Sequence, residues 1–238
     1  MNWSAGKVGT INQRPARANG LSTPAIGCVL DLPALPGGGS KIYDRSPYGN
    51  IGTITGATWV RLPSGLWCLS FDGSDDHVGI PNSASLDIAN AITLMVWVRS
   101  SVNSNCRMLW KQNYGNAGYG LWSTSDVSFD TGHAVGGRDM LASGVNTADD
   151  VWHLITGTYD VDAGTNNKKV FIDGVQKNQK TLTEAIGSYA SSLYIGAASP
   201  SVTVLTGYIA PPRIHNRALS ALEIQNSFNR EKHLFGVW

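Results

Sequence analysis

The chain has 238 residues with a formal net charge of +1, 42% hydrophobic and 15% charged residues, and it contains 27 glycines, 8 tryptophans and 8 tyrosines. So few charged residues exclude a coiled coil, a highly charged helical bundle and an acidic disordered chain. The balanced charge gives no uniform field to attract a phosphate backbone, so we expect no nucleic acid among the partners. The length, the low share of charged residues and the many glycines and aromatic residues predict one all-β domain.

Residues 1–23 mix Gly, Asn, Arg and Ala without a period, which predicts an N-terminal arm, either a tether for assembly or a disordered end. The domain itself is predicted over residues 24–238. Apolar stretches such as Ile92–Val98 are far shorter than the roughly 20 residues that span a bilayer, and the N-terminus lacks the apolar region of a signal peptide. We expect a soluble chain without membrane insertion, whose localisation, extracellular or virion-associated, stays open.

The three cysteines, Cys28, Cys68 and Cys106, are widely spaced and form no CxxC motif. This pattern indicates neither a disulfide framework nor a thiolate zinc site. Buried free thiols are the favoured interpretation. A bridge between Cys28 and Cys68 is the alternative, because both lie in apolar runs that can form neighbouring strands.

From residue 24 onward, short apolar or alternating runs recur about every 10 to 15 residues between Gly, Asn, Asp and Ser clusters, a spacing typical of a sandwich or barrel. The run 92–99 alternates strictly. Its predicted core face holds Ile92, Leu94, Val96 and Val98, and its other face holds Thr93, Met95, Trp97 and Arg99. Because the second face is amphipathic and aromatic, we expect it on the concave side of a sheet, where a ligand can lie.

Turn residues support these strands. Asp173-Gly174 separates the runs 169–172 and 175–177, which predicts a hairpin with a type I′ turn. Asp72-Gly73 predicts a second chain reversal before the run 77–80. The one predicted helix covers 220–230, where Ser220 and Glu223 have the spacing of a capping box, and no helix longer than about 12 residues is expected.

Seven sequence blocks then occur in a recognisable order: GTITGATW (52–59), LSFDGSDDHVGIP (69–81), SLDIANAITLMVWVR (85–99), VWHLITGTYD (151–160), KVFIDGVQ (169–176), SLYIGAAS (192–199) and RIHNRALSALEI (213–224). Their order and spacing resemble the laminin-G-like domains of the concanavalin A-like lectin/glucanase superfamily. The resemblance implies an all-β jelly roll of two antiparallel sheets, with glycan or protein ligands on the concave face or on the loops at its rim.

The resemblance also implies a structural calcium site, held in relatives by an acidic residue before the last strand. Here Ala210 stands at that position, and Pro211-Pro212 follows, which predicts a bulge or an edge strand. We therefore expect the family site to lack calcium. Asp160 and Asp162 are weak alternative calcium ligands, but their loop lacks a closing bidentate Glu, so a plain polar loop is favoured and no other cofactor is expected.

Catalytic chemistry finds little support in the residues. A glycoside hydrolase needs two facing carboxylic acids, whereas the three glutamates, Glu184, Glu223 and Glu231, lie outside any predicted strand. A polysaccharide lyase needs a His or Tyr base, and His153 is the candidate, but the alginate lyase motifs of this fold are absent. We predict a structural role for His153 and no catalytic residue, with lyase or hydrolase activity as an alternative.

Carbohydrate binding is better supported, because sugar rings stack on aromatic side chains while their hydroxyls bond to amides. The predicted carbohydrate-binding residues are Trp110, Gln112, Asn113, Tyr114, Asn116, Tyr119 and Trp122. In the alternative interpretation, Trp110 and Trp122 are strand core residues and only Tyr114 projects. We predict a non-catalytic, lectin-like module that binds a polysaccharide or glycan. The alternative is a virion or surface-assembly protein that oligomerises or docks through residues 1–23.

Overall fold

The computed structural model describes residues 26–33, 35–36, 39–102, 105–113, 117–135 and 137–238. The first sheet, called the β7 sheet here, contains β1 (Cys28–Asp31), β4 (Thr58–Arg61), β5 (Trp67–Asp72), β7 (Ala91–Arg99), β12 (His153–Asp160), β13 (Lys168–Ile172), β14 (Val175–Lys180) and β16 (Thr206–His215). The second, called the β9 sheet, contains β2 (Lys41–Ile42), β3 (Gly52–Thr55), β6 (His77–Ile80), β8 (Cys106–Asn113), β9 (Ala117–Ser123), β10 (Val127–His133), β11 (Gly137–Ala142) and β15 (Leu193–Ile195).

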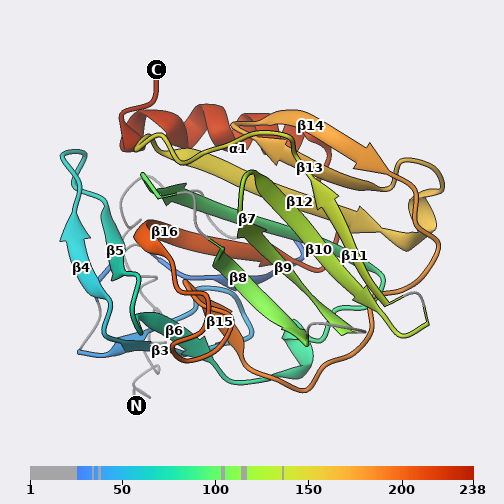
Figure 1. Cartoon of the computed structure of the whole chain (residues 1–238), viewed down its shortest axis with the longest axis horizontal. Helices are drawn as coiled ribbons and strands as arrows, with labels where there is room; N and C mark the ends of the chain where they lie inside the picture. Colours follow the sequence, from blue (N-terminus) through green and yellow to red (C-terminus); the bar gives the residue numbers. More distant parts are fainter. Residues whose placement is uncertain (1–25, 34, 37–38, 103–104, 114–116, 136) are drawn as a thin grey trace, which may run out of the picture.

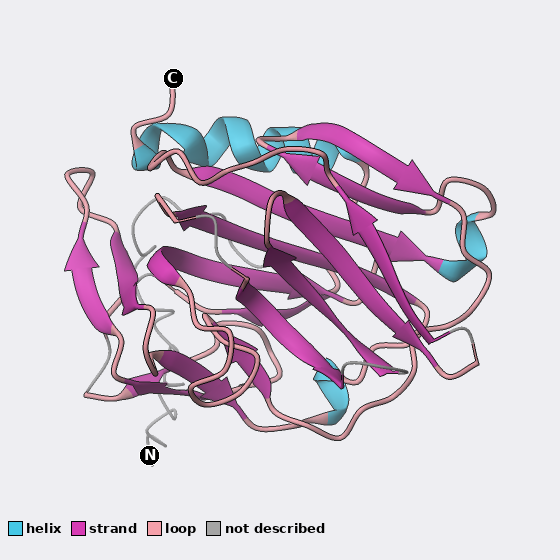
Figure 2. Cartoon of the chain, viewed as in Figure 1, coloured by secondary structure: helices cyan, strands magenta, loops and turns pink. Residues whose placement is uncertain are grey.

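The two sheets are antiparallel and pack face to face (Figure 1). Their strand orders are β14-β13-β12-β7-β16-β5-β4, with β1 also paired to β16, and β11-β10-β9-β8-β15-β6-β3-β2. Helical structure is confined to α1 (Ala221–Glu231) and three short 3₁₀ turns, η1 (Ala84–Leu86), η2 (Val161–Ala163) and η3 (Lys232–Phe235), among the described residues (Figure 2). The predicted two-sheet jelly roll with one short C-terminal helix is confirmed.

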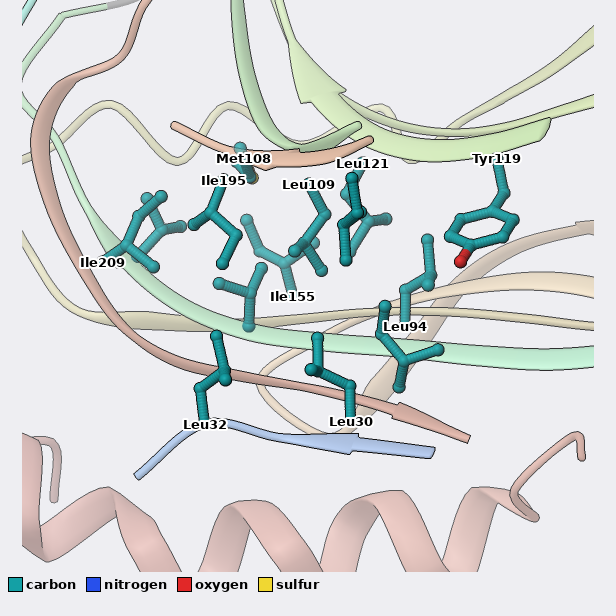
Figure 3. Packing of buried hydrophobic residues seen from close by; sticks show 14 of the residues in the cluster. Leu30, Leu32, Leu94, Met108, Leu109, Tyr119, Leu121, Ile155, Ile195 and Ile209 are labelled. Carbon is teal, nitrogen blue, oxygen red and sulfur yellow. The ribbon is translucent and has the colours of Figure 1, made fainter. Parts of the chain in front are cut away.

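The core lies between the sheets, as the period of two along each strand requires. On β7, the predicted inner residues Ile92, Leu94, Val96 and Val98 are all buried in it. Leu109 and Leu121 meet them from the β9 sheet (Figure 3).

A second apolar cluster covers the outer face of the β7 sheet. The ring of Trp97 stacks on Phe235, with 4.2 Å between ring centroids, and also on Phe228 of α1. The predicted capping box starts this helix, since Ser220 Oγ accepts from Glu223 N and the Glu223 carboxylate accepts from Ser220 N. The expectation that Thr93, Met95, Trp97 and Arg99 line a ligand face is therefore wrong, because α1 and η3 bury most of that face.

The predicted turns are present. Asp173 and Gly174 have φ values of 55° and 77°, as a type I′ hairpin between β13 and β14 requires. Asp72-Gly73 reverses the chain, but it links β5 to β6 and so carries the chain from one sheet to the other. The pairing of β16 with β7 shifts register between Ala210 and Arg213, so the two prolines produce the predicted bulge in an interior strand.

Cys28, Cys68 and Cys106 are free and buried, which confirms the favoured interpretation. Burial raises the thiol pKa of Cys28 and of Cys68 to about 12. No helix among the described residues is long and apolar enough to cross a membrane. The predicted arm, residues 1–23, lies outside the described residues.

Candidate functional site

One row of outward-facing residues crosses the whole β9 sheet. It consists of Lys41, Thr53, Gly79, Tyr194, Trp110, Gly120, Asp130 and Met140, each the Cα partner of the next. Their strand neighbours, including Val78, Leu121 and Phe129, belong to the core, so these side chains point outward. Because paired strands lie roughly 4.8 Å apart, this transverse row is about 34 Å long.

Two glycines of the transverse row lie beside aromatic rings. A Cβ atom on Gly120 would lie 2.3 Å from Cε3 of Trp110, so the indole rests directly against the backbone of β9. Tyr194 lies beside Gly79 at an ordinary distance, since a Cβ atom on Gly79 would lie 3.6 Å from Tyr194 Cε1, and the Tyr194 ring meets His77 edge-on with 5.8 Å between ring centroids. Tyr194 is partly exposed, whereas Trp110 is buried.

Arginine and tryptophan side chains stack next to this row. The Arg107 guanidinium carbon lies 4.5 Å from the Trp110 ring centroid and 4.6 Å from that of Trp122. Arg138 lies 4.9 Å from the Trp122 ring and pairs with Asp130. Cation–π contacts of this kind fix the rings and the guanidinium groups against one another. We call Arg107, Trp110, Trp122, Asp130 and Arg138 the Arg-Trp cluster.

Buried polar atoms beside the Arg-Trp cluster lack partners among the described residues. Gln112 is only 5% exposed, yet neither its Oε1 nor its Nε2 has a hydrogen-bond partner. Asp130 is fully buried, and its Oδ2 accepts from Arg138 Nε at 2.6 Å while its Oδ1 has no partner. Burial raises the pKa of Asp130, although Arg138 opposes the shift. A buried polar group without a partner costs about 1 to 3 kcal/mol, so water or a ligand that reached these atoms would recover that cost.

The predicted carbohydrate-binding residues divide into three groups. Trp110, Gln112 and Trp122 come together on the outer face. Tyr119 does not join them, because it lies three positions before Trp122 and so points into the core, where its hydroxyl donates to Leu86 O at 2.8 Å (Figure 3). The prediction that Tyr119 binds carbohydrate is therefore wrong, because successive side chains of a strand point to opposite faces and Tyr119 lies on the inner one.

The third group, the Asn113 side chain together with Tyr114 and Asn116, lies outside the described residues. The alternative interpretation, in which Trp110 and Trp122 are strand core residues, is also corrected. Both side chains are buried, but on the outer face of the β9 sheet and not between the sheets. Sequence reasoning missed Arg107, Asp130, Arg138 and Tyr194. Charged residues at alternating positions inside apolar strands were the available signal.

His153 is held by carboxylates. Its Nδ1 lies 2.7 Å from Asp173 Oδ2 and its Nε2 lies 3.1 Å from Asp149 Oδ1, while Asp173 Oδ1 accepts from Leu154 N. Burial disfavours the charged ring, but Asp173 and Asp149 outweigh that effect and raise the pKa of His153. The ring thus links the β13–β14 turn, through Asp173, to the segment before β12, through Asp149, which is a structural task.

Two of the glutamates are likewise engaged in ion pairs. Glu231 pairs with Arg213, and Glu223 pairs with Arg217. The hydrogen bond from Arg217 is the main reason that the pKa of Glu223 falls to about 2. Neither carboxylate faces the Arg-Trp cluster or the transverse row.

The residues at the family calcium position do not fit the ion. Ala210 is buried in the cluster beneath α1 and offers no side-chain oxygen. In the alternative loop, Asp160 Oδ1 accepts from Asp162 N, so it already caps η2. Asp72, Asp75 and Asp76 approach within 4.8 Å of one another, but Asp76 Oδ2 is used by the backbone N–H of Asp72.

A family model described as the concanavalin A-like lectin/glucanases superfamily matches residues 72–225. No curated protein sequence matches the chain.

Among solved structures, the binding domain of Paraclostridial Mosquitocidal Protein 1 aligns with a TM-score of 0.70 and 13% identity over 89% of this chain and 55% of that one. The binding domain of Botulinum Neurotoxin DC in complex with SialylT aligns with a TM-score of 0.67 and 12% identity, over 86% of this chain and 51% of that one. This chain thus spans about half the length of the toxin structures it matches. A third structure is Domain 4 of AbnA, a GH43 extracellular arabinanase from Geobacillus stearothermophilus, in complex with arabinotriose. It aligns with a TM-score of 0.61 and 16% identity, over 78% of this chain and 91% of that one.

Proposed function

Because the chain belongs to the concanavalin A-like lectin/glucanase superfamily, we propose that it is a glycan-binding module whose ligand lies on the outer face of the β9 sheet. One observation carries the proposal: the buried amide of Gln112, whose two polar atoms have no partner within the described part of the chain, lies on the same face as the Arg-Trp cluster.

The chemistry of this face suits a saccharide. The Gln112 amide offers one acceptor and two donor hydrogens, and Asp130 Oδ1 offers a further acceptor. Arg138 holds Asp130 in place. Along the transverse row, the partly exposed ring of Tyr194 supplies an apolar surface for the C–H face of a sugar. A row across eight strands offers length for an oligosaccharide.

The comparisons support a saccharide ligand in a limited way. The arabinanase domain was solved with arabinotriose, and this chain covers 91% of it. The proposal is for binding without catalysis, since His153, Glu223 and Glu231 are engaged in internal contacts. The assembly alternative rests on residues 1–23, outside the described part of the chain.

A glycan array followed by titration calorimetry on the best ligand tests the proposal. We expect Gln112→Ala to weaken binding by at least about tenfold, since a lost pair of ligand hydrogen bonds corresponds to about 1.4 kcal/mol or more. Gln176→Ala is the matched control, because Gln176 is an exposed glutamine on β14, in the other sheet. Unchanged affinity in Gln112→Ala, or an array without any bound glycan, would contradict the proposal.

A further inference from the structure

A separate groove lies at the edge of the sandwich, between the loop that follows β2 and the segment that links η1 to β7. Val29 and Ile88 form its apolar floor, and Tyr48, Asp87, Asn90 and Asn216 stand among its walls. Its volume is about 520 Å³, within the range of roughly 300 to 1,000 Å³ typical of small-molecule clefts. None of the residues lining this groove belongs to the transverse row or to the Arg-Trp cluster.

The loop that carries Tyr48 is fixed by a hub of hydrogen bonds. The carboxylate of Asp44 accepts from the backbone N–H groups of Asp31, Ser46 and Asn50. Ser46 Oγ and Asn50 Nδ2 donate to the same carboxylate. The local sequence produces this arrangement, because Asp and Asn side chains readily bond to backbone N–H groups a few residues away.

The same hub ties the loop to both sides of the groove. Asn50 Nδ2 donates to Val29 O at 2.9 Å on β1. Asn50 Oδ1 accepts from Ser83 Oγ at 2.6 Å, immediately before η1. Tyr48, which is 52% exposed, therefore projects from a loop whose conformation is already fixed. Little further ordering of this loop is needed when a ligand binds.

The polar residues of the groove also stand on fixed backbone. Asn90 O accepts from Val161 N, and Asn216 N donates to Gly27 O. Asp87 Oδ2 accepts from Ser188 Oγ at 2.7 Å. Asp87, Asn90 and Asn216 are all exposed, so one carboxylate and two amides face a ligand. Among the described residues, no lysine, arginine or histidine lines this groove, which disfavours carboxylated or phosphorylated ligands.

We infer that this groove binds one or two sugar units of a neutral glycan, as a saccharide site distinct from the face of the β9 sheet. The apolar floor and the Tyr48 ring receive the C–H face of a sugar, and the carboxylate and amides bond to its hydroxyls. The assignment goes beyond the proposed function, because it uses none of the residues of the β9 face.

Tyr48→Ala and Tyr43→Ala form a matched pair for the test. Tyr43 lies on the same loop and is 53% exposed, against 52% for Tyr48, but it does not line the groove. The probes are arabinotriose, maltotriose and N-acetyllactosamine as neutral saccharides, and sialyllactose and trigalacturonate as acidic ones. Saturation-transfer NMR and calorimetry on the full chain measure binding at millimolar probe concentrations.

We expect a neutral probe to bind and Tyr48→Ala to weaken it at least about tenfold, with Tyr43→Ala and Gln112→Ala each changing that affinity less than about twofold. Three results would overturn the inference. The two tyrosine variants could weaken binding equally, the groove could bind acidic probes but no neutral one, or the Gln112→Ala variant could bind no neutral probe at all. A probe lost in Gln112→Ala but kept in Tyr48→Ala supports the proposed function and refutes the groove site. The reverse pattern supports the groove, while the β9-face site is judged separately by the best ligand of the glycan array, whose affinity must fall in Gln112→Ala, so the two failures are distinguishable.

Discussion

The indole Nε1 of Trp97 on β7 donates a 2.8 Å hydrogen bond to Oε2 of Glu231 at the end of α1. The same oxygen accepts from Arg213 Nη2 at 2.7 Å, and Glu231 is 1% exposed. A buried carboxylate thus joins the C-terminal helix to two central strands of the β7 sheet. This contact holds α1 against the strand face that carries Trp97, so that face is buried.

Replacing Glu231 tests this connection. Glu231→Ala leaves the buried Arg213 guanidinium without its carboxylate, so we expect the free energy of unfolding to fall by about 3 to 5 kcal/mol. Glu223→Ala is the control, since it removes a partly exposed ion pair and one cap and should cost only about 1 to 2 kcal/mol. Urea unfolding at pH 7 measures both, and equal losses would show that the buried connection contributes little.

His215 predicts acid sensitivity. Burial, together with Arg213 and Arg217, lowers the pKa of His215 to about 4, from an ordinary value near 6.5. As pH falls through 6.5, the unfolded chain binds this proton before the folded chain does, so stability falls between pH 6.5 and about 4, by up to about 3 kcal/mol from this group. In His215→Gln, the decline in unfolding free energy over that window should be shallower. A decline as steep as that of the wild type would refute the assignment.

His153 predicts the opposite trend. Its pKa is raised in the folded state, because Asp173 and Asp149 outweigh burial. The folded chain therefore holds the proton longer as pH rises, and the stabilisation is complete below about pH 6.5 and disappears as pH passes the raised value. Unfolding free energies of wild type and His153→Gln should differ more at pH 6 than at pH 9. A difference that grows with pH would contradict the clamp by two carboxylates.

These residues also show how far sequence reasoning reaches. Alternation predicted both faces of β7 correctly, but the aromatic face was assigned to a ligand because nothing near Trp97 in the sequence reveals that Phe228 and Phe235 will stack on it. The groove likewise depends on Asn50 bonding to Ser83, 33 positions away. Local period determines faces, whereas long-range packing determines which faces remain open.

Calcium should have little effect on stability. The Asp160 carboxylate is used to cap η2, and Ala210 offers no side-chain oxygen, whereas Ca²⁺ requires about six to eight oxygen ligands. Neither millimolar calcium nor a chelator should shift the melting temperature by more than about 1 °C, since stabilisation follows the ratio of free ion to Kd. A large upward shift that Asp75→Asn abolishes would instead assign calcium to the Asp72, Asp75 and Asp76 group.

The two glycines of the transverse row give a matched steric test of the β9 face. A Cβ on Gly120 would lie 2.3 Å from Trp110 Cε3 and 3.0 Å from Leu109 O, so Gly120→Ala must push the indole away and disturb its stacking with Arg107. Overpacking of this kind costs about 1 to 3 kcal/mol. On Gly79, the same atom would lie 3.6 Å from Tyr194 Cε1, an ordinary contact, so Gly79→Ala should change stability by less than about 1 kcal/mol.

Glycan binding separates the two variants further. If the ligand depends on the Arg-Trp cluster, Gly120→Ala should lose affinity at least about tenfold even at temperatures where the variant is fully folded, because Trp110 and Arg107 no longer hold the wall beside Gln112. Gly79→Ala should bind nearly as the wild type does. Urea unfolding and calorimetry of both variants measure the two effects. Equal behaviour in stability and in binding would mean that the indole does not rest on the β9 backbone as described.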